Sequence, residues 1–192
     1  MKKRSGGSIP GSWWEVRVVS WNCASLFPTN KMTRRMRHRI FGLIADQADI
    51  LLLQETHGFL ETFEVSELKR FLNDFHIFVG DPPDRATGGT ATLIRKSKFK
   101  GFKWTKEELA PGRVLRVHGE GERGEDAKIW NVHNYKLGAG DVRRSKHKLE
   151  DDADEAANLP KHMLWIGGDW NFCDEEDSTF APEAAENFFG NL

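Results

Sequence analysis

Apolar residues in the first half of the chain alternate between short continuous runs and helical spacing. The runs at residues 14–21 (WEVRVVSW) and 49–54 (DILLLQ) predict two strands, and the nearly unbroken second run is typical of a strand buried on both faces. Between them, apolar side chains recur at helical spacing among arginines over residues 32–47, which predicts one amphipathic helix. The same spacing predicts a second helix over residues 61–73, and residues 76–79 (HIFV) resemble a further strand.

Short strands gather in the second half of the chain. Residues 90–96 (TATLIRK) follow a glycine pair, residues 113–119 (RVLRVHG) follow Pro-Gly, and we expect both in an antiparallel meander. Residues 128–135 (KIWNVHNY) and 163–167 (MLWIG) predict two more strands, separated by a charged surface helix at residues 141–158. The order of these elements indicates an α/β fold of two mixed β-sheets, packed face to face and flanked by helices as a four-layer α/β sandwich.

The composition is that of one ordinary globular domain. The chain has 192 residues, of which 39% are hydrophobic and 30% charged. We expect residues 1–13 to form a flexible basic leader and residues 14–192 to form the folded domain. The longest apolar runs are far too short to span a bilayer, which predicts no membrane association. Two cysteines are too few for a disulfide framework and no secretory signal is evident, which favours an intracellular protein, nuclear or cytoplasmic.

The overall charge does not indicate a nucleic-acid partner. The 28 lysines and arginines against 29 acidic residues leave a net charge of -1, so the chain has no global positive field. Basic residues do cluster locally, at residues 2–4, 34–39 and 143–148. Each cluster has two interpretations, a solvated helix face or tail on the one hand and a phosphate-binding patch on the other.

Several predicted strands end in a polar residue for which an apolar core has no use. Asn22 follows the first strand, Glu55 follows the second, and Asp169 with Asn171 follows the last. Because ligands of α/β sheets bind outside the carboxyl ends of the strands, these side chains could converge on one site. Carboxylate and amide oxygens are the ligands that Mg²⁺ prefers, so the chemistry suits a magnesium site.

Each of these residues also has a purely structural interpretation. Asn22 or Asn171 could cap a turn, and Asp169 could cap a turn or helix after the glycine pair. Glu55 is harder to explain in this way, since an unpaired charge at the end of a buried strand is costly. Taken together, the four residues favour a site.

Five segments of the chain resemble a known superfamily. Between about residues 16 and 172 they occur in the order SWNCASL, DILLLQETH, GGTATLI, KIWNVHNY and WIGGDWNF. This set resembles the endonuclease/exonuclease/phosphatase superfamily, which includes DNase-like nucleases, abasic-site and retrotransposon endonucleases, deadenylases, sphingomyelinases and inositol-phosphate phosphatases. The resemblance implies a DNase I-like fold and phosphodiester hydrolysis that depends on Mg²⁺, with Mn²⁺ as an alternative.

The resemblance also implies a role for each site residue. Glu55 resembles the principal metal carboxylate, and Asn22 resembles a second metal-site residue that reaches the ion directly or through water. Asp169 resembles the acid that orients or deprotonates the attacking water. Asn171, on the same side of an extended segment, would bind the scissile phosphate. His133 would contact phosphate or protonate the leaving oxygen, and its alternative interpretation is a core histidine bonded within the sheet.

One expected element of the superfamily is absent from the sequence. A late Ser-Asp-His motif usually supplies the general base, yet no histidine follows His162. We therefore expect a fold that is incomplete at its C-terminus, with the last strands missing, and inefficient turnover by this chain. We favour a nucleic-acid endonuclease of the retroelement or DNase-like kind, with nucleic acid as its partner. The alternatives are a noncatalytic remnant that binds metal or nucleic acid, and an inositol-phosphate or lipid phosphatase. The sequence selects neither DNA nor RNA and predicts no oligomeric state.

Overall fold

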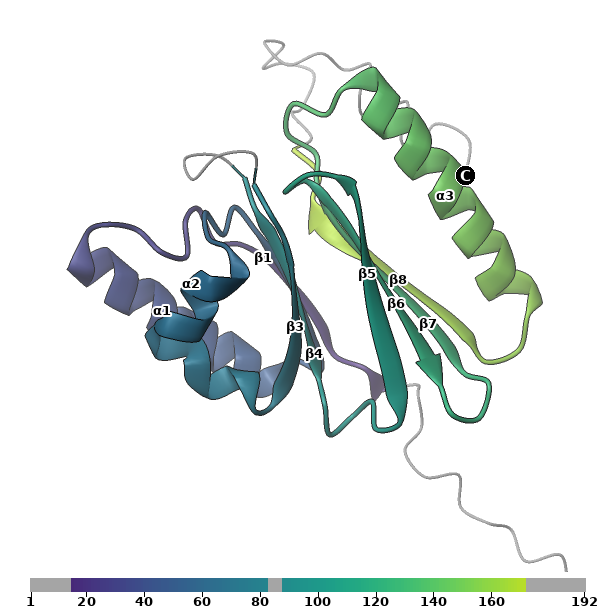
Figure 1. Ribbon diagram of the computed structural model, residues 1–192, viewed down its shortest axis with the longest axis horizontal. Helices are drawn as coiled ribbons and strands as arrows, with labels where there is room; N and C mark the ends of the chain where they lie inside the picture. Colours follow the sequence, from purple (N-terminus) through teal and green to yellow (C-terminus); the bar gives the residue numbers. More distant parts are fainter. Residues whose placement is uncertain (1–14, 83–87, 172–192) are drawn as a thin grey trace, which may run out of the picture.

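Two four-stranded β-sheets pack face to face in the computed structural model, which describes residues 15–82 and 88–171, and helices cover their outer faces (Figure 1). In their order across each sheet, the strands are β1 (Val18–Asn22), β2 (Ile50–Gln54), β4 (Thr90–Arg95) and β3 (Phe75–Gly80), then β5 (Phe102–Ala110), β6 (Val114–Gly121), β7 (Asp126–His133) and β8 (His162–Asp169). The predicted four-layer α/β sandwich is confirmed. The expected leader, Trp14 and everything after Asn171 lie outside the described residues.

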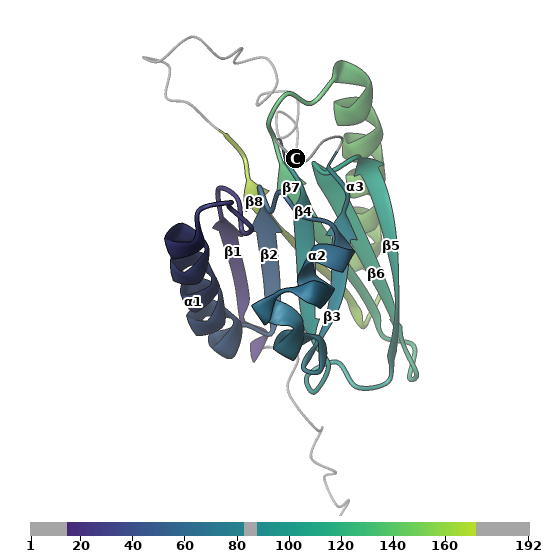
Figure 2. The same cartoon turned by 60° about the vertical axis from the view of Figure 1, so that its left-hand side comes forward.

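The strand directions bring the carboxyl ends of β1, β2, β7 and β8 to the same end of the sandwich. β1 runs parallel to β2, and β7 runs parallel to β8, whereas the other neighbouring strands pair antiparallel. Figure 2 shows the upper end of β8 beside β1 and β2, and the side chains of Asn22 and Asp169 join them there. The upper edge of the fold is therefore shared by both sheets.

The single meander expected for residues 90–96 and 113–119 is wrong. β4 pairs with β2 and β3 in the first sheet, whereas β6 pairs with β5 and β7 in the second. The strand between them, β5, did not stand out in the sequence because its segment FKWTKEELA is rich in lysine and glutamate. Such residues suit the exposed edge of a sheet, which is where β5 lies.

The helix expected over residues 61–73 is divided at Ser66 into α2 (Leu60–Val65) and the 3₁₀ helix η2 (Glu67–Leu72). Ser66 is extended, with φ -88° and ψ 174°. Its hydroxyl donates to the Phe63 carbonyl and accepts from the Leu68 N–H, and such local side-chain bonds compete with a continuous helix. The other two predicted helices are confirmed, as α1 (Lys31–Gln47) and α3 (Ala139–Asn158).

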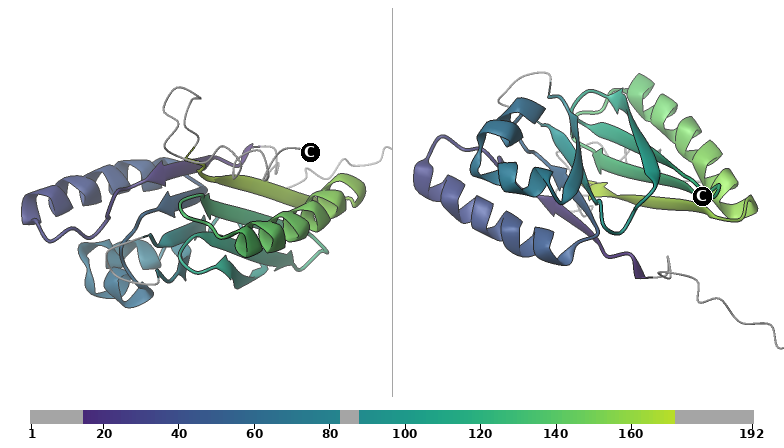
Figure 3. Two further views of the ribbon diagram at one scale, coloured as in Figure 1. Left: turned by 90° about the horizontal axis from the view of Figure 1, so that it is seen from above. Right: turned by 60° about the horizontal axis from the view of Figure 1, so that its bottom comes forward.

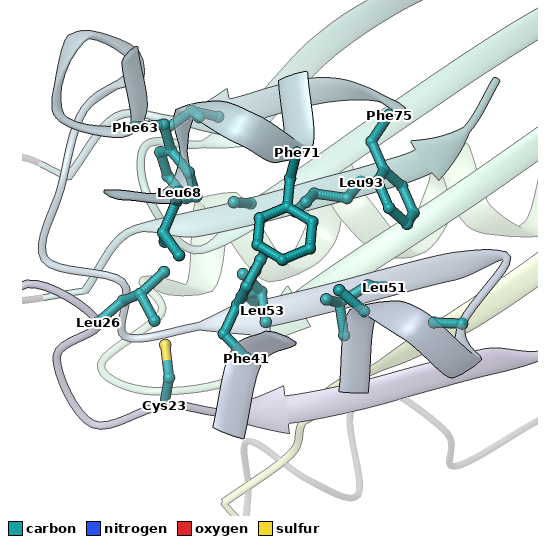
Figure 4. Close-up of a cluster of buried hydrophobic side chains, with 14 residues drawn as sticks. Cys23, Leu26, Phe41, Leu51, Leu53, Phe63, Leu68, Phe71, Phe75 and Leu93 are labelled. Atoms are coloured by element: carbon teal, nitrogen blue, oxygen red, sulfur yellow. The ribbon is translucent and has the colours of Figure 1, made fainter. Parts of the chain in front are cut away.

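β2 is buried on both faces, as its sequence predicted. Leu51 and Leu53 pack on the side of the first sheet that α1, α2 and η2 cover, in a cluster that includes Phe41 and Phe71 (Figure 4). Alternate residues of the same strand, such as Leu52, join the core between the two sheets. Because successive side chains of a strand point to opposite faces of the sheet, β2 contributes to two separate apolar clusters.

α3 covers the outer face of the second sheet, on the opposite side of the molecule from α1 (Figure 3). Its buried Asp152 accepts hydrogen bonds from Arg116 Nε and Nη2 at 2.7 and 2.8 Å and from Trp130 Nε1 at 2.9 Å. The surface helix of the sequence prediction is therefore anchored to β6 and β7 by a buried ion pair. None of the described helices has the length and apolar character that crossing a membrane requires.

Candidate active site

Four of the five predicted site residues meet at the carboxyl ends of β1, β2, β7 and β8. Asn22 Nδ2 donates to Asp169 Oδ2 at 2.6 Å, which joins the first and second sheets. His133 pairs in register with Asp169, and its Nε2 lies 3.4 Å from Glu55 Oε1. The convergence that the strand-end pattern predicted is present in the folded chain.

Asn171 lies at the same rim but not as expected. Its φ of 47° is left-handed, so the segment after β8 is not extended, contrary to the prediction. The Asn171 N–H donates to Asp169 Oδ1 at 3.0 Å. Both oxygens of Asp169 therefore accept a hydrogen bond from an amide group, which fixes the orientation of the carboxylate.

Backbone strain gathers around these strand ends. Five of the seven described non-glycine residues with positive φ lie in the rim loops: Ala24, Ser25, Glu55, His57 and Asn171. The Ser25 N–H donates to the Glu55 carbonyl at 2.7 Å, so the loop after β1 holds the loop after β2. Left-handed conformations cost about 1–3 kcal/mol each in such residues and concentrate at functional sites.

Two glycines before Asp169 allow β8 to approach its neighbours closely. A Cβ on Gly168, whose φ is 155°, would lie 1.8 Å from the Val132 carbonyl oxygen in β7. A Cβ on Gly167 would lie 2.7 Å from the end of the Leu52 side chain in the facing sheet. The first clash is with backbone and the second with a side-chain methyl group that can turn away. Gly168 therefore sets the position of Asp169.

Gly168→Ala is expected to lower the free energy of unfolding by more than about 2 kcal/mol, because the added methyl group forces β8 away from β7. Gly167→Ala is the matched control and should cost less, since Leu52 can change rotamer. Urea denaturation followed by circular dichroism measures both variants. Equal stability of Gly168→Ala and the unmodified chain would contradict this account of the strand.

Arg113 is a site residue that sequence reasoning missed. Its Nη1 lies 2.7 Å from His133 Nδ1, and a guanidinium has no acceptor, so it must donate and Nδ1 must be unprotonated. The proton of neutral His133 is then on Nε2, the atom that faces Glu55. In the sequence, Arg113 stands out only as a basic residue directly after a Pro-Gly turn. In the folded chain it lies opposite Gly88, where an added Cβ would come within 2.9 Å of the guanidinium.

His133 is held in its neutral form. Burial is the main cause that lowers the pKa of His133 below 6.5, and the positive charge of Arg113 lowers it further, against the opposing effects of Glu55 and Asp169. Nε2 is buried and makes no hydrogen bond of good geometry with any described residue. A neutral imidazole with an unused N–H suits donation to an oxygen of a bound phosphate.

Arg113→Gln is expected to raise the pKa of His133 in the metal-free protein, because one of the charges that lower it is removed. Because the pKa of His133 is lower in the folded chain than in the unfolded chain, neutral His133 favours the folded state fully above about pH 6.5. This stabilisation is lost as the pH falls through the folded pKa. The variant should therefore lose less stability over that acidic window. Histidine ring NMR titration, with His133→Gln for assignment, measures the shift, and an unchanged or lower pKa would contradict the proposed contact.

A buried polar pair ties the two sheets together just below the site. Gln54 Nε2 donates to Asn131 Oδ1 at 2.7 Å, and Asn131 Nδ2 donates to the Leu53 and Ala91 carbonyls at 3.0 Å. Both side chains are fully buried. Sequence reasoning also missed this pair, which fixes β2 against β7 and hence Glu55 against His133.

The donors at the strand ends fit a hard divalent cation. Glu55 has 30% of its side chain exposed, and among the described residues only His133 lies within ion-pair distance of it. A second group of possible ligands lies at the opposite end of the second sheet and consists of Asp126 and His162, which begin β7 and β8, and Glu155 of α3. Lys128 already contacts the carboxylates of that group, which leaves less negative charge there for a cation.

Comparisons with known proteins agree with this fold. The model of the Endonuclease/Exonuclease/phosphatase family matches residues 19–189. Similar solved structures include D. rerio TDP2 complexed with single strand DNA product (19% identity, TM-score 0.52, 84% of this chain and 62% of that one). AP endonuclease LMAP from Leishmania major shares 18% identity with a TM-score of 0.58, over 90% of this chain and 64% of that one.

Phosphatases have the same fold. The mannosyl-6-phosphatase Bt3783 of Bacteroides thetaiotaomicron shares 16% identity with a TM-score of 0.56, over 92% of this chain and 70% of that one. The chain therefore spans 62–70% of the length of these three structures. No curated protein sequence matches it significantly. At such identities the structural likeness shows the fold alone.

Proposed function

The chain belongs to the Endonuclease/Exonuclease/phosphatase family, whose members are mostly hydrolytic enzymes, and from this premise we propose that it is a divalent-metal-dependent phosphodiester hydrolase acting on nucleic acid. The observation that carries the proposal is the meeting of Asn22, Glu55, His133 and Asp169 at one rim of the sandwich. Four polar side chains from four strands of two sheets have no packing reason to converge there.

Glu55 would hold the metal, because its carboxylate is accessible and has no stronger partner among the described residues. Asn22 Oδ1 accepts from the Ala24 N–H at 2.9 Å and keeps a second lone pair for the ion or for a water bound to it. When bound, Mg²⁺ or Mn²⁺ would neutralise charge on the nonbridging phosphate oxygens and acidify a coordinated water.

The remaining residues would position the substrate. Neutral His133 would donate a hydrogen bond from Nε2–H to a phosphate oxygen, since Arg113 keeps Nδ1 as the acceptor. Transfer of that proton to the leaving oxygen is not expected, because it would leave an imidazolate. Asp169, held by Asn22 and by the backbone of Asn171, would orient the attacking water and accept its hydrogen bond. Asn171 is exposed at the same rim and would bind a nonbridging oxygen.

Two of the structural likenesses favour nucleic acid. They are a TDP2 structure with a single strand DNA product and an AP endonuclease. The mannosyl-6-phosphatase supports a second candidate, hydrolysis of a phosphate monoester on a small molecule. The two candidates share the strand-end site, so substrate choice separates them rather than site chemistry.

Nicking of supercoiled plasmid in Mg²⁺ or Mn²⁺, with and without EDTA, tests the proposal. We expect slow, metal-dependent nicking that Asp169→Asn abolishes, because the amide no longer presents two acceptor oxygens. A labelled RNA strand and p-nitrophenyl phosphate serve as parallel substrates. Hydrolysis of the monoester alone would establish the phosphatase instead, and metal binding without any hydrolysis would show a noncatalytic binding module.

A further inference from the structure

The two halves of α3 carry opposite charge. Its first ten residues contain four basic side chains and one acidic, whereas its last ten contain five acidic side chains and none that is basic. The helix macrodipole favours the reverse order, with acidic groups near the N-terminus and basic groups near the C-terminus. The stability of the helix therefore does not explain the arrangement.

The acidic half has a structural explanation within the fold. Asp152 pairs with Arg116 of β6, and Glu155 contacts Lys128 of β7, so this half anchors the helix to the second sheet. These contacts use the acidic residues that lie nearest the strands. Two of the five acidic residues of this half are thus paired with cations of the sheet.

The basic half has no such explanation. We define the basic ridge as Arg143, Arg144, Lys146 and Lys148. Arg144 pairs with Asp141 one turn earlier and is 65% exposed. Over residues 15–82 and 88–171, no carboxylate lies within ion-pair distance of the other three, and Arg143 is exposed. Arg143 and Arg144 are therefore exposed to solvent, whereas Lys146 and Lys148 are half-buried without a carboxylate partner among the described residues.

The ridge lies at the same end of the molecule as the strand-end site. α3 begins just after β7, on the upper side in Figure 1, where the carboxyl ends of β7 and β8 also lie. Tyr135 stacks on His133 with ring centroids 5.9 Å apart, and Lys136 Nζ lies 5.0 Å from the centre of the Tyr135 ring. A groove of about 710 Å³ is lined by the four basic residues together with His147, Leu109 near the end of β5, and the acidic Glu150 and Asp151.

We propose that the basic ridge binds the sugar-phosphate backbone of a nucleic-acid substrate whose scissile phosphate lies at the strand ends. The inference rests on the proposed function and extends it to a surface beyond the reacting groups. Residues 143 to 148 span about 7.5 Å along the helix axis, so one small phosphate cannot contact the whole ridge. A backbone that carries a charge at every nucleotide can, and it would release counterions from several cations at once.

Binding of a fluorescein-labelled 20-base-pair DNA duplex, measured by anisotropy in EDTA between 50 and 200 mM KCl, tests the ridge. The triple variant Arg143→Gln, Lys146→Gln, Lys148→Gln should bind at least about 10-fold more weakly at the lowest salt. The slope of log affinity against log salt should become shallower by about 2 to 3. The variant Lys100→Gln, Lys103→Gln, Arg123→Gln makes the same charge change on exposed residues at the opposite end and should bind normally.

Equal weakening by both triple variants, or an unchanged salt slope in the ridge variant, would overturn the proposal. Arg143→Gln alone provides a milder change, with an expected slope reduction of about 0.9, should the triple variant unfold. Because EDTA removes hydrolysis, the outcomes separate. If the ridge variant binds DNA more weakly but the unmodified chain never hydrolyses DNA, only the proposed function is contradicted. If the unmodified chain hydrolyses DNA but the ridge variant binds DNA normally, only the role of the ridge is contradicted.

Discussion

Glu55→Gln is expected to reduce metal-dependent hydrolysis by at least about 100-fold, since even outer-shell changes at metal sites cost 10–100-fold in activity or affinity. The substitution keeps the size of the side chain and removes the charge that would attract the cation. Among the described residues, Glu55 and Asp169 are the carboxylates that follow or end β2 and β8, so loss of Glu55 halves the charge that these two present. In a calorimetric titration, the affinity of the variant for Mn²⁺ should fall by the same factor as its rate of plasmid nicking.

Glu64→Gln is the matched control for this variant. Glu64 is exposed on α2, makes no ion pair with the described residues, and loses the same charge on substitution. It should bind Mn²⁺ and nick plasmid as the unmodified chain does. The same heat of Mn²⁺ binding for Glu55→Gln and for Glu64→Gln would remove the proposed metal site.

Asp152→Ala is expected to lower the free energy of unfolding by about 3–5 kcal/mol, because it removes the buried partner of the Arg116 guanidinium and leaves only the exposed Glu107, 3.3 Å away. Arg116 has 8% of its surface exposed and donates twice to Asp152, which also accepts from Trp130. Burial raises the pKa of Asp152, but the bonds from Arg116 and Trp130 hold it below its usual value. The stabilisation is therefore present above about pH 3.8 and lost as pH falls through the folded pKa.

Two further variants separate the ion pair from a general effect on α3. Asp151→Ala removes a neighbouring exposed carboxylate and should change stability by less than about 0.5 kcal/mol. The double variant Arg116→Met, Asp152→Leu replaces both charges with apolar groups and should recover much of the loss. Urea unfolding at pH 7 compares all three, and a loss below about 1 kcal/mol for Asp152→Ala would contradict the role of this pair.

Stability and the proposed chemistry depend on different parts of the molecule. The Arg116–Asp152 pair lies between the second sheet and α3, whereas Glu55 and Asp169 lie at the strained rim. Removing a charge from such a rim commonly leaves stability unchanged or raises it. Glu55→Gln should therefore unfold at the same urea concentration as the unmodified chain, or at a higher one.

Local sequence patterns predicted most of the fold. β2 was recognised from an unbroken apolar run and α1 from helical spacing, because burial on two faces or on one stripe leaves such patterns directly in the sequence. β5 escaped because an edge strand with charged side chains has neither pattern. The break at Ser66 escaped because a single hydroxyl, bonded to its neighbours, determines it.

The candidate site was predicted in part, for a similar reason. Glu55 and Asp169 stand out as polar residues at the ends of apolar strands, and this is a local signal. Arg113 and the Gln54–Asn131 pair act across elements, at separations of 20 and 77 residues, which no local pattern reveals. The left-handed turn at Asn171 was also unpredictable, because asparagine adopts extended and left-handed conformations alike.

The central claim is that one divalent cation binds at the strand ends beside Glu55. Crystals soaked in Mn²⁺ and measured for anomalous scattering test this claim directly. We predict a peak within coordination distance of a Glu55 carboxylate oxygen, on the side of Asn22 and Asp169. A peak only at the group of Asp126, Glu155 and His162, or no peak at the strand ends in the Mn²⁺-soaked crystals, would contradict the account.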